Sequence, residues 1–266
     1  MPELAEVEFY RKQWNTGVGE RIEKVHVHAQ KRIFRTTDAL LLADHLSGKI
    51  LRTSHAHGKQ MLFGFSGGVW IGLHLGMSGK LFSTVNNYRP AKHDHLVLFN
   101  RNTILAFEDP RQFGAVRLHL GEKHPDWWTS LPPQLLDDNF DINYVREALH
   151  RRARSALKAI LLDQRFFPGI GNWMADEILW RAGLHPSTRG GKLTDTESLS
   201  LYFFSKQVSR DALDVISTNW GTPPLHWLFS HRWKDGGICP KSGKPLVRET
   251  IGGRTTCYSP TVQPLL

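Results

Sequence analysis

Cysteine is scarce in this chain, with 2 residues among 266. So few cysteines exclude a disulfide-dense scaffold and indicate a reducing compartment. The sequence also lacks any apolar run near the roughly 20 residues of a membrane span, and its N-terminus lacks the apolar core of a signal peptide. We therefore expect a soluble cytoplasmic protein without a membrane partner.

Acidic residues are outnumbered, with 25 Asp and Glu against 34 Lys and Arg, which gives a formal charge of +9 and a pI of about 9.7. This balance favours a polyanionic partner, and nucleic acid is the first candidate. The alternative is a surface of solvated lysines. The apolar fraction of 40% excludes a disordered chain, and the length allows one large or two modest domains.

The opening stretch, Met1 to Glu8, carries the first chemical signal. Removal of Met1 before a small residue leaves Pro2 as a terminal secondary amine, and a terminal amine has a reference pKa of about 8. Such an amine can attack C1′ of a sugar and form a Schiff base, and Glu3 beside it can move protons. The alternative is an ordinary helix start, since proline and acidic residues both favour the first turn.

The remaining pattern predicts an α+β fold. Short strands with tight turns fill residues 50–118, which indicates an antiparallel β-sandwich or flattened barrel with flanking helices. Two prolines without strand signals place a linker at 129–139. Four helical segments follow, and the end of the chain returns to a β-hairpin. The predicted helices are Ile142–His150, Ser155–Gln164, Asn172–Ala182 and Thr194–Ile216, the last with a capping box of Thr194 and Glu197. The predicted domains are 1–128, 140–235 and 236–266.

A second informative stretch runs from Lys158 to Asn172. It reads as a helix, a turn with Gly169 and Gly171, and a second helix capped by Asn172. Backbone N–H groups at a helix start form an anion site, and phosphate is the obvious anion for a basic chain. The alternative is a simple helix corner with an N-cap asparagine.

Together these stretches resemble the formamidopyrimidine-DNA glycosylase and endonuclease VIII family of base-excision repair enzymes. The resemblance runs the whole length, and its motifs occur in family order. The motifs are Met1–Glu8, Gly58-Lys59, Leu75–Gly79, Lys92–His95, Asp109–Gly114 and the Gly169–Asn172 turn. Ala5 stands where the family often has proline.

The resemblance implies a bilobal fold that binds damaged DNA, with a β-sandwich domain and a helix–two-turn–helix domain. It implies that Pro2 is the nucleophile on C1′ and Glu3 the general acid and base, with Glu6 a structural member of the same motif. No cofactor is implied for the reaction. We expect the protein to be a monomer that is located, as in bacteria, in the cytosol or nucleoid.

The resemblance also assigns the DNA contacts. Lys59, counted with the catalytic residues, would contact the phosphate beside the lesion, and Lys158, Asn172 and His93 would contact further phosphates. Met77, Arg111 and Phe113 would fill the space left by the everted base, because lost stacking must be replaced. The alternatives are that Met77 and Phe113 belong to the core, that Lys59 is solvated, and that His93 only braces its loop.

The C-terminal hairpin departs from the family pattern. The family's four zinc-binding cysteines correspond here to Cys239, Ser242, Ser259 and Val262. A serine hydroxyl and a valine cannot replace zinc thiolates, so we predict that structural zinc is absent. The turn at Gly252-Gly253 still presents Arg254 towards DNA, as a zincless finger. A disulfide between the two cysteines is not expected in a reducing cell.

The predicted function is a bifunctional DNA glycosylase and abasic-site lyase that acts by β,δ-elimination on oxidised or ring-opened bases. The segment Thr218–Cys239 looks too short for a loop that covers 8-oxoguanine, which favours oxidised pyrimidines, ring-opened purines or abasic sites. One alternative is a damage-recognising DNA-binding protein without excision activity. Another is a basic RNA- or DNA-binding structural protein, which leaves the wedge residues and the free imino terminus unexplained.

Overall fold

The computed structural model describes residues 1–85 and 87–265 and shows an α+β protein with antiparallel sheets. The chain divides into two compact units. The first comprises Met1–Pro2 and Glu6–Leu131, and the second comprises Glu3–Ala5 and Pro132–Leu266. Three residues at the start of the chain therefore pack with its C-terminal half. No helix in the described part of the chain is long and apolar enough to span a membrane.

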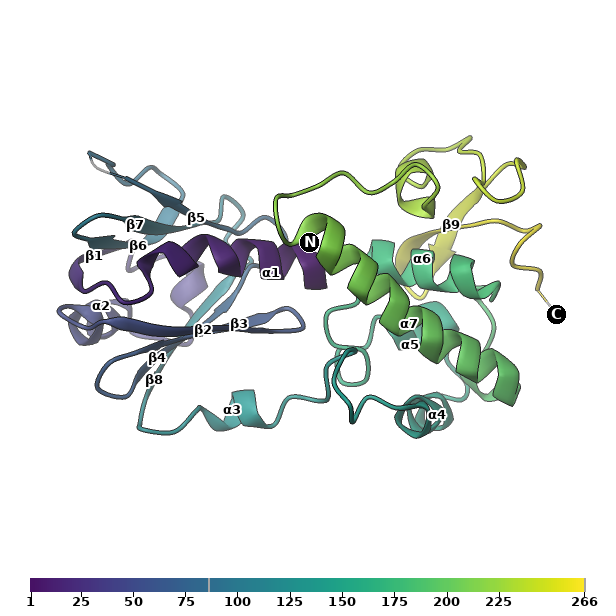
Figure 1. The fold of residues 1–266 in the computed structure, drawn as a ribbon, viewed down its shortest axis with the longest axis horizontal. Coiled ribbons are helices and arrows are strands. Elements are labelled where there is room, and N and C mark those ends of the chain that lie inside the picture. The colour runs from purple at the N-terminus through teal and green to yellow at the C-terminus, as the bar shows by residue number, and fades with distance from the viewer. Residues whose placement is uncertain (86, 266) are drawn as a thin grey trace. The chain divides into compact units, whose positions relative to one another are not determined.

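The first unit is built from two four-stranded antiparallel sheets, with strand orders β1-β6-β7-β5 and β2-β3-β4-β8 (Figure 1). Its strands are β1 (Ile22–Val27), β2 (Leu51–His57), β3 (Gln60–Phe65), β4 (Val69–His74), β5 (Lys80–Thr84), β6 (Asp94–Asn100), β7 (Ile104–Glu108) and β8 (Ala115–Leu120). Its helices are α1 (Leu4–Gln13), α2 (Ala39–Leu46) and α3 (Asp126–Thr129), with 3-10 turns η1 (Trp14–Gly17) and η2 (Arg32–Phe34).

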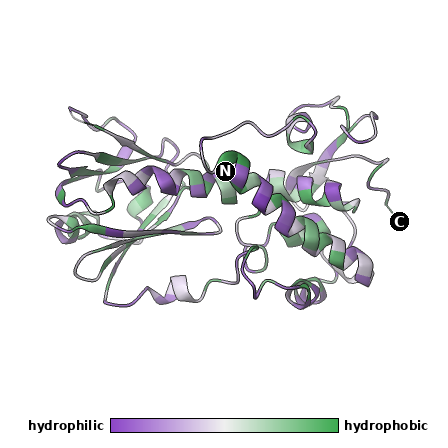
Figure 2. Cartoon of the chain, in the orientation of Figure 1, coloured by the Kyte–Doolittle hydropathy of each residue, from purple (hydrophilic) through white to green (hydrophobic). Residues whose placement is uncertain are grey.

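A single apolar core joins the two sheets to α1. It takes alternate side chains from both sheets, such as Phe63 on β3 and Phe107 on β7, together with Val7 and Trp14 from the α1–η1 segment. The Trp14 and Phe63 rings lie 4.8 Å apart. Figure 2 shows both apolar and polar residues along the strands, and a second, smaller apolar cluster of Val97, Ile104 and Ala106 covers the other face of β6 and β7. The predicted antiparallel sandwich is therefore confirmed.

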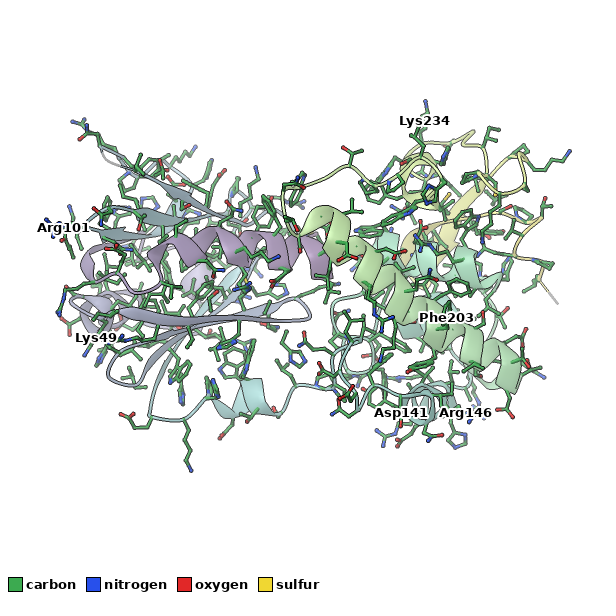
Figure 3. All side chains as sticks on the ribbon, viewed as in Figure 1. Lys49, Arg101, Asp141, Arg146, Phe203 and Lys234 are labelled. Atoms are coloured by element: carbon green, nitrogen blue, oxygen red, sulfur yellow. The ribbon has the colours of Figure 1, made fainter. Side chains whose placement is uncertain are left out.

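The second unit is helical and ends in a two-stranded sheet. Its helices are α4 (Ile142–Arg151), α5 (Leu157–Leu161), α6 (Asn172–Ala182) and α7 (Asp195–Ile216), with 3-10 turns η3 (Gly190–Lys192) and η4 (Leu228–His231). The capping box at the start of α7 is present, with Thr194 and Glu197 bonded reciprocally. Buried residues of all four helices share one core with Leu4 and Ala5. Phe203 projects outward from α7 and is 56% exposed (Figure 3).

Two local predictions in this unit are wrong. Helix α5 covers only Leu157–Leu161, shorter than the predicted 155–164. The N-cap of α6 is Gly171, and Asn172 is the first helical residue. The capping acceptor comes from elsewhere in the chain, as described below.

The C-terminal hairpin pairs β9 (Val247–Ile251) with β10 (Arg254–Tyr258). Gly252 and Gly253 form the predicted turn, with φ values of 61° and 75°. Both residues of such a turn require the left-handed region, where glycine has no steric cost. The turn brings Arg254 to the exposed start of β10.

Candidate functional site

Glu3 is held at the N-terminus of α6. Its side chain is 3% exposed, and its two carboxylate oxygens accept three backbone hydrogen bonds. Oε2 accepts from the N–H groups of Gly171 at 2.9 Å and Met174 at 3.1 Å, and Oε1 accepts from Trp173 at 3.0 Å. The N–H donors and the positive end of the helix dipole stabilise a negative carboxylate. Glu3 thus supplies the cap that the sequence assigned to Asn172.

The neighbours of Glu3 fix its place in the chain. The Leu4 N–H donates to the carbonyl of Gly169 at 3.0 Å, and the N–H of Gly169 donates to the Gln164 Oε1 at 3.0 Å. The opening residues are thus bonded to the turn before α6. Pro2, next to Glu3, is partly exposed, and Met1 is 54% exposed.

Glu6 lies one turn further along α1 and is partly buried. Burial, with the charge of Glu6 as the next cause, raises the pKa of Tyr10 on the same helix. Glu6 therefore lies near Tyr10, and its assignment to a structural role stays a prediction.

Lys59 and His74 lie beside each other in the first unit. Lys59 precedes β3, whose first residue, Gln60, pairs with His74 at the end of β4. Burial, followed by the positive charges of Lys59, Arg117 and Arg35, lowers the pKa of His74 to about 4. The neutral ring accepts a hydrogen bond from the N–H of Gly76 through Nδ1 at 3.0 Å, so Nε2 carries the proton. Sequence reasoning missed His74, because a histidine at a strand end has no local signal.

The three proposed wedge residues come from two loops of the first unit. Met77 is 41% exposed and Phe113 is 40% exposed, so neither belongs to the core. The Arg111 guanidinium lies 4.7 Å from the centre of the Phe113 ring. A Cβ atom on Gly76 would lie 2.4 Å from the Phe113 carbonyl carbon, which shows that the two loops are in backbone contact. The fold therefore gathers these side chains on adjacent loops.

His93 is only partly buried and forms part of a bracing network. Its carbonyl accepts the N–H of Asp109 at 3.0 Å, and its ring lies 6.4 Å from that of His95. These contacts fit the bracing alternative. Its predicted phosphate contact is not tested by them.

Lys158 is not available to a phosphate, and that prediction is wrong. Its side chain is fully buried, and its ammonium group donates to Asp176 Oδ1 at 2.5 Å and to the carbonyl of Asn172 at 2.7 Å. Arg232 binds the other Asp176 oxygen at 2.6 Å, and the N–H of Cys257 reaches that oxygen at 3.1 Å. Lys158 therefore belongs to a buried ion network that ties α5 and α6 to the C-terminal hairpin.

Asn172 connects the start of α6 to the same hairpin. Its side-chain amide donates to the carbonyl of Thr255 at 2.8 Å. Its Oδ1 atom is buried and accepts no hydrogen bond from the described residues. Arg254, the residue before Thr255, is exposed at the hairpin turn. The second unit thus brings Asn172 and Arg254 to one region, while their contacts with phosphates stay predictions.

The donor set at the family's metal position does not fit zinc. Cys239 is buried, and its sulfur accepts a hydrogen bond from the Trp180 indole at 3.3 Å. Burial raises the pKa of Cys239, but hydrogen bonds with Ser242, Ser259 and Trp180 outweigh that effect and lower the pKa to about 7. Val262 packs against the apolar cluster that contains Cys239. One thiol with two hydroxyls and a valine lacks the nitrogen and sulfur ligands that structural zinc requires.

The buried Glu3 carboxylate at the start of α6, the exposed Met77 and Phe113 on adjacent loops, and the net charge of +9 are compatible with a protein that acts on nucleic acid. Comparison with known families agrees. The Formamidopyrimidine-DNA glycosylase N-terminal domain matches residues 1–116, and the Formamidopyrimidine-DNA glycosylase H2TH domain matches residues 131–220. The chain belongs to the formamidopyrimidine-DNA glycosylase family.

Individual relatives cover the full length. The formamidopyrimidine-DNA glycosylases of Geotalea daltonii and Geobacter metallireducens are 34% and 33% identical, over 99% of this chain and 100% of each relative. The crystal structure of wild-type Lactococcus lactis Fpg (MutM) with N7-benzyl-Fapy-dG DNA is 26% identical with a TM-score of 0.87. A structure of MutM with carbocyclic 8-oxo-G DNA has the same identity and TM-score, 26% and 0.87. Each covers 99% of this chain, and this chain covers 100% of each.

Proposed function

We propose that this chain is a bifunctional DNA glycosylase and abasic-site lyase, with Pro2 as the nucleophile once Met1 has been removed. Family membership supports the glycosylase part. The lyase activity and the role of Pro2 are supported by the position of the Glu3 carboxylate. It follows Pro2 directly in the chain and accepts hydrogen bonds from three backbone N–H groups. A fixed anion at this point can accept a proton from the amine and stabilise the cation that forms on it.

The proposed reaction begins with attack of the Pro2 nitrogen on C1′ of an everted nucleotide. The N–C1′ bond forms, the glycosidic bond breaks, and the base leaves with the electron pair and takes a proton from solvent. The proton lost by the amine passes to Glu3, which returns it to the sugar ring oxygen as the C1′–O4′ bond opens. A secondary amine then holds the sugar as an iminium ion.

The lyase step follows from this cation. Loss of a proton from C2′ breaks the bond to the 3′ phosphate, and a second elimination releases the 5′ phosphate. Water hydrolyses the remaining imine and frees Pro2. Glu3 is the proton carrier for these steps in our proposal, and the chain's own residues suffice for them without a cofactor.

We further propose that Lys59, His93, Asn172 and Arg254 contact DNA phosphates, and that Met77, Arg111 and Phe113 fill the space left by the everted base. Phosphate contacts set the register without reading sequence. The exposure of Arg254, Met77 and Phe113 and the net charge of +9 support these roles. The DNA complexes formed by structural neighbours support damaged DNA as the partner.

Two observations bear on the substrate class: the length of the segment 218–239 and the names of the full-length relatives. The short segment 218–239 suggested oxidised pyrimidines, ring-opened purines or abasic sites, and the relatives reported above all carry the formamidopyrimidine-DNA glycosylase name. Full-length similarity outweighs the length of one loop, so we propose ring-opened purines as the first substrate. Excision rates on formamidopyrimidine, 8-oxoguanine and thymine glycol duplexes rank the three; thymine glycol as the fastest would reverse the assignment.

We propose that the C-terminal hairpin keeps its fold without zinc. Hydrogen bonds to Cys239 and the apolar cluster of Trp180, Leu228, Leu246 and Cys257 support this. Metal analysis of purified protein should find less than about one tenth of a zinc per chain. One tightly bound zinc per chain would refute the proposal.

The main test is covalent trapping. The protein is mixed with an oligonucleotide that contains an abasic site, and sodium borohydride is added to reduce any imine. We expect a stable adduct with the wild-type chain and none with a form that retains Met1, in which the Pro2 nitrogen is part of a peptide bond and is not nucleophilic. A DNA-binding protein without excision activity would shift the oligonucleotide in a gel yet give no adduct with any form.

A further inference from the structure

Insertion of Met77, Arg111 and Phe113 into a base stack requires two loops of the first unit to be held in a fixed relative position. Met77 belongs to the loop after β4, whereas Arg111 and Phe113 belong to the loop after β7. Side chains on two independently mobile loops would lose conformational freedom when they enter a base stack, and this loss opposes insertion. A link between the loops that exists before DNA binds would reduce this cost.

The Asp109 carboxylate supplies such a link. It is fully buried and bonds to both loops at once. Oδ1 accepts from the Ser78 hydroxyl at 2.7 Å, next to Met77, and from the N–H of Arg111 at 3.3 Å. Oδ2 accepts from the N–H of Gly114 at 2.7 Å, next to Phe113. A buried anion with three donors is a strong and specific connection.

Steric contacts complete the connection. Gly76 has a φ of +62°, and a Cβ on it would lie within 2.6 Å of three backbone atoms of Phe113 and Gly114. A Cβ on Gly114 would lie 2.9 Å from the His74 carbonyl and 3.0 Å from Asp109 Oδ2. The loops therefore touch backbone to backbone at glycines, with the carboxylate between them.

The backbone of Asp109 also makes hydrogen bonds that fix its position. Its carbonyl oxygen lies 3.0 Å from His95 Nε2, and its N–H donates to the carbonyl of His93 at 3.0 Å. The His95 ring is buried, and its Nδ1 faces the Nδ1 of His28 at 3.1 Å. The backbone of Asp109 is thus bonded to the start of β6, which fixes the position from which its carboxylate reaches both loops.

We propose that Asp109 is a positioning residue that joins the Met77 loop and the Arg111–Phe113 loop into one preformed wedge. The inference rests on the proposed function, because it concerns insertion into damaged duplex DNA. It predicts a defect that depends on base stacking. A duplex with a flipped nucleotide needs the wedge, whereas a single strand has no stack to fill.

The test compares Asp109→Ala with wild type on two substrates, a duplex and a single strand that carry the same abasic site. We expect borohydride trapping in single turnover to fall at least tenfold on the duplex and less than threefold on the single strand. A fluorescent 2-aminopurine opposite the site reports wedge insertion directly, and its signal change should disappear. Asp109→Asn, which keeps an acceptor for one loop, should recover at least part of the duplex rate.

Two further variants make the result decisive. Ser78→Ala removes only the link to the Met77 loop and should lower duplex trapping by about two- to fivefold. This variant replaces Asp109→Ala in the test if Asp109→Ala does not fold. Glu108→Gln, a neighbouring acid with no bond to either loop among the described residues, is the matched control and should match wild type.

Equal losses on both substrates, or full duplex activity in Asp109→Ala and Ser78→Ala, would overturn the inference. Failure of the proposed function looks different. In that case the wild-type chain gives no adduct on either substrate.

Discussion

Gly171 shows at the scale of one residue how the candidate site constrains the chain. A Cβ atom at this position would lie 2.2 Å from the Glu3 carboxylate carbon. The backbone of Gly171 has a φ of −124°, which any residue can adopt. Glycine is required here because the carboxylate occupies the space of a side chain.

The first prediction is that Gly171→Ala displaces Glu3 and lowers single-turnover excision by about 10²-fold or more, within the range for a lost acid–base group. Affinity for abasic DNA should stay within about threefold. Gly236→Ala is a control for adding a methyl group away from Glu3: the added Cβ meets open space, but the φ of +75° disfavours alanine, so its stability should fall slightly while its excision rate stays at wild type. Excision by Gly171→Ala at the wild-type rate would mean that the position of Glu3 does not matter for the chemistry.

At the scale of elements, Asp176 organises the second unit. From the middle of α6 it accepts bonds from Lys158 on α5, from Arg232 after η4, and from the backbone of β10. The hairpin that presents Arg254 is therefore fixed by a buried ion network in addition to its small apolar cluster. This network supports the proposal that the hairpin keeps its fold without zinc.

Asp176→Ala tests this element. It leaves two buried cations without their carboxylate, and we expect the free energy of unfolding to fall by about 3–5 kcal/mol. Asp195→Ala removes a carboxylate that is 87% exposed and paired with Arg146, so it should cost at most about 1 kcal/mol. Urea unfolding of both variants measures the difference, and equal losses would contradict the buried-network account.

A pH prediction concerns His74, the last residue of β4. His74 has a pKa of about 4 in the folded chain against 6.5 for the free group. Between these values the unfolded chain binds the proton more readily, so stability rises with pH. The contribution is complete above pH 6.5 and is lost as the pH falls towards 4, with a size of about 2 kcal/mol after allowance for solvent screening.

His74→Gln should flatten this dependence. Thermal or urea unfolding of wild type and variant across pH 4–7 gives the comparison. The other histidines with lowered pKa values, such as His95 and His185, keep a residual slope in both proteins. An identical slope in wild type and variant would show that His74 is not held neutral.

At the scale of the whole molecule, the sequence pattern predicted those features that depend on interactions between residues close together in the chain. The capping box of α7 and the Gly252-Gly253 turn follow from residues near in sequence. The sequence could not reveal that a carboxylate 168 residues away would cap α6. Lys158 was misassigned for the same reason, because a lysine after a helix start looks solvated until its buried partner is known.

The central claim is that the imino nitrogen of Pro2 forms the covalent bond to the sugar. Peptide mapping of the borohydride-trapped complex by mass spectrometry tests it directly. We predict that the added sugar mass lies on the N-terminal peptide, at Pro2, in chains that have lost Met1. The same mass on a lysine such as Lys59, or an adduct on chains that still carry Met1, would contradict the account.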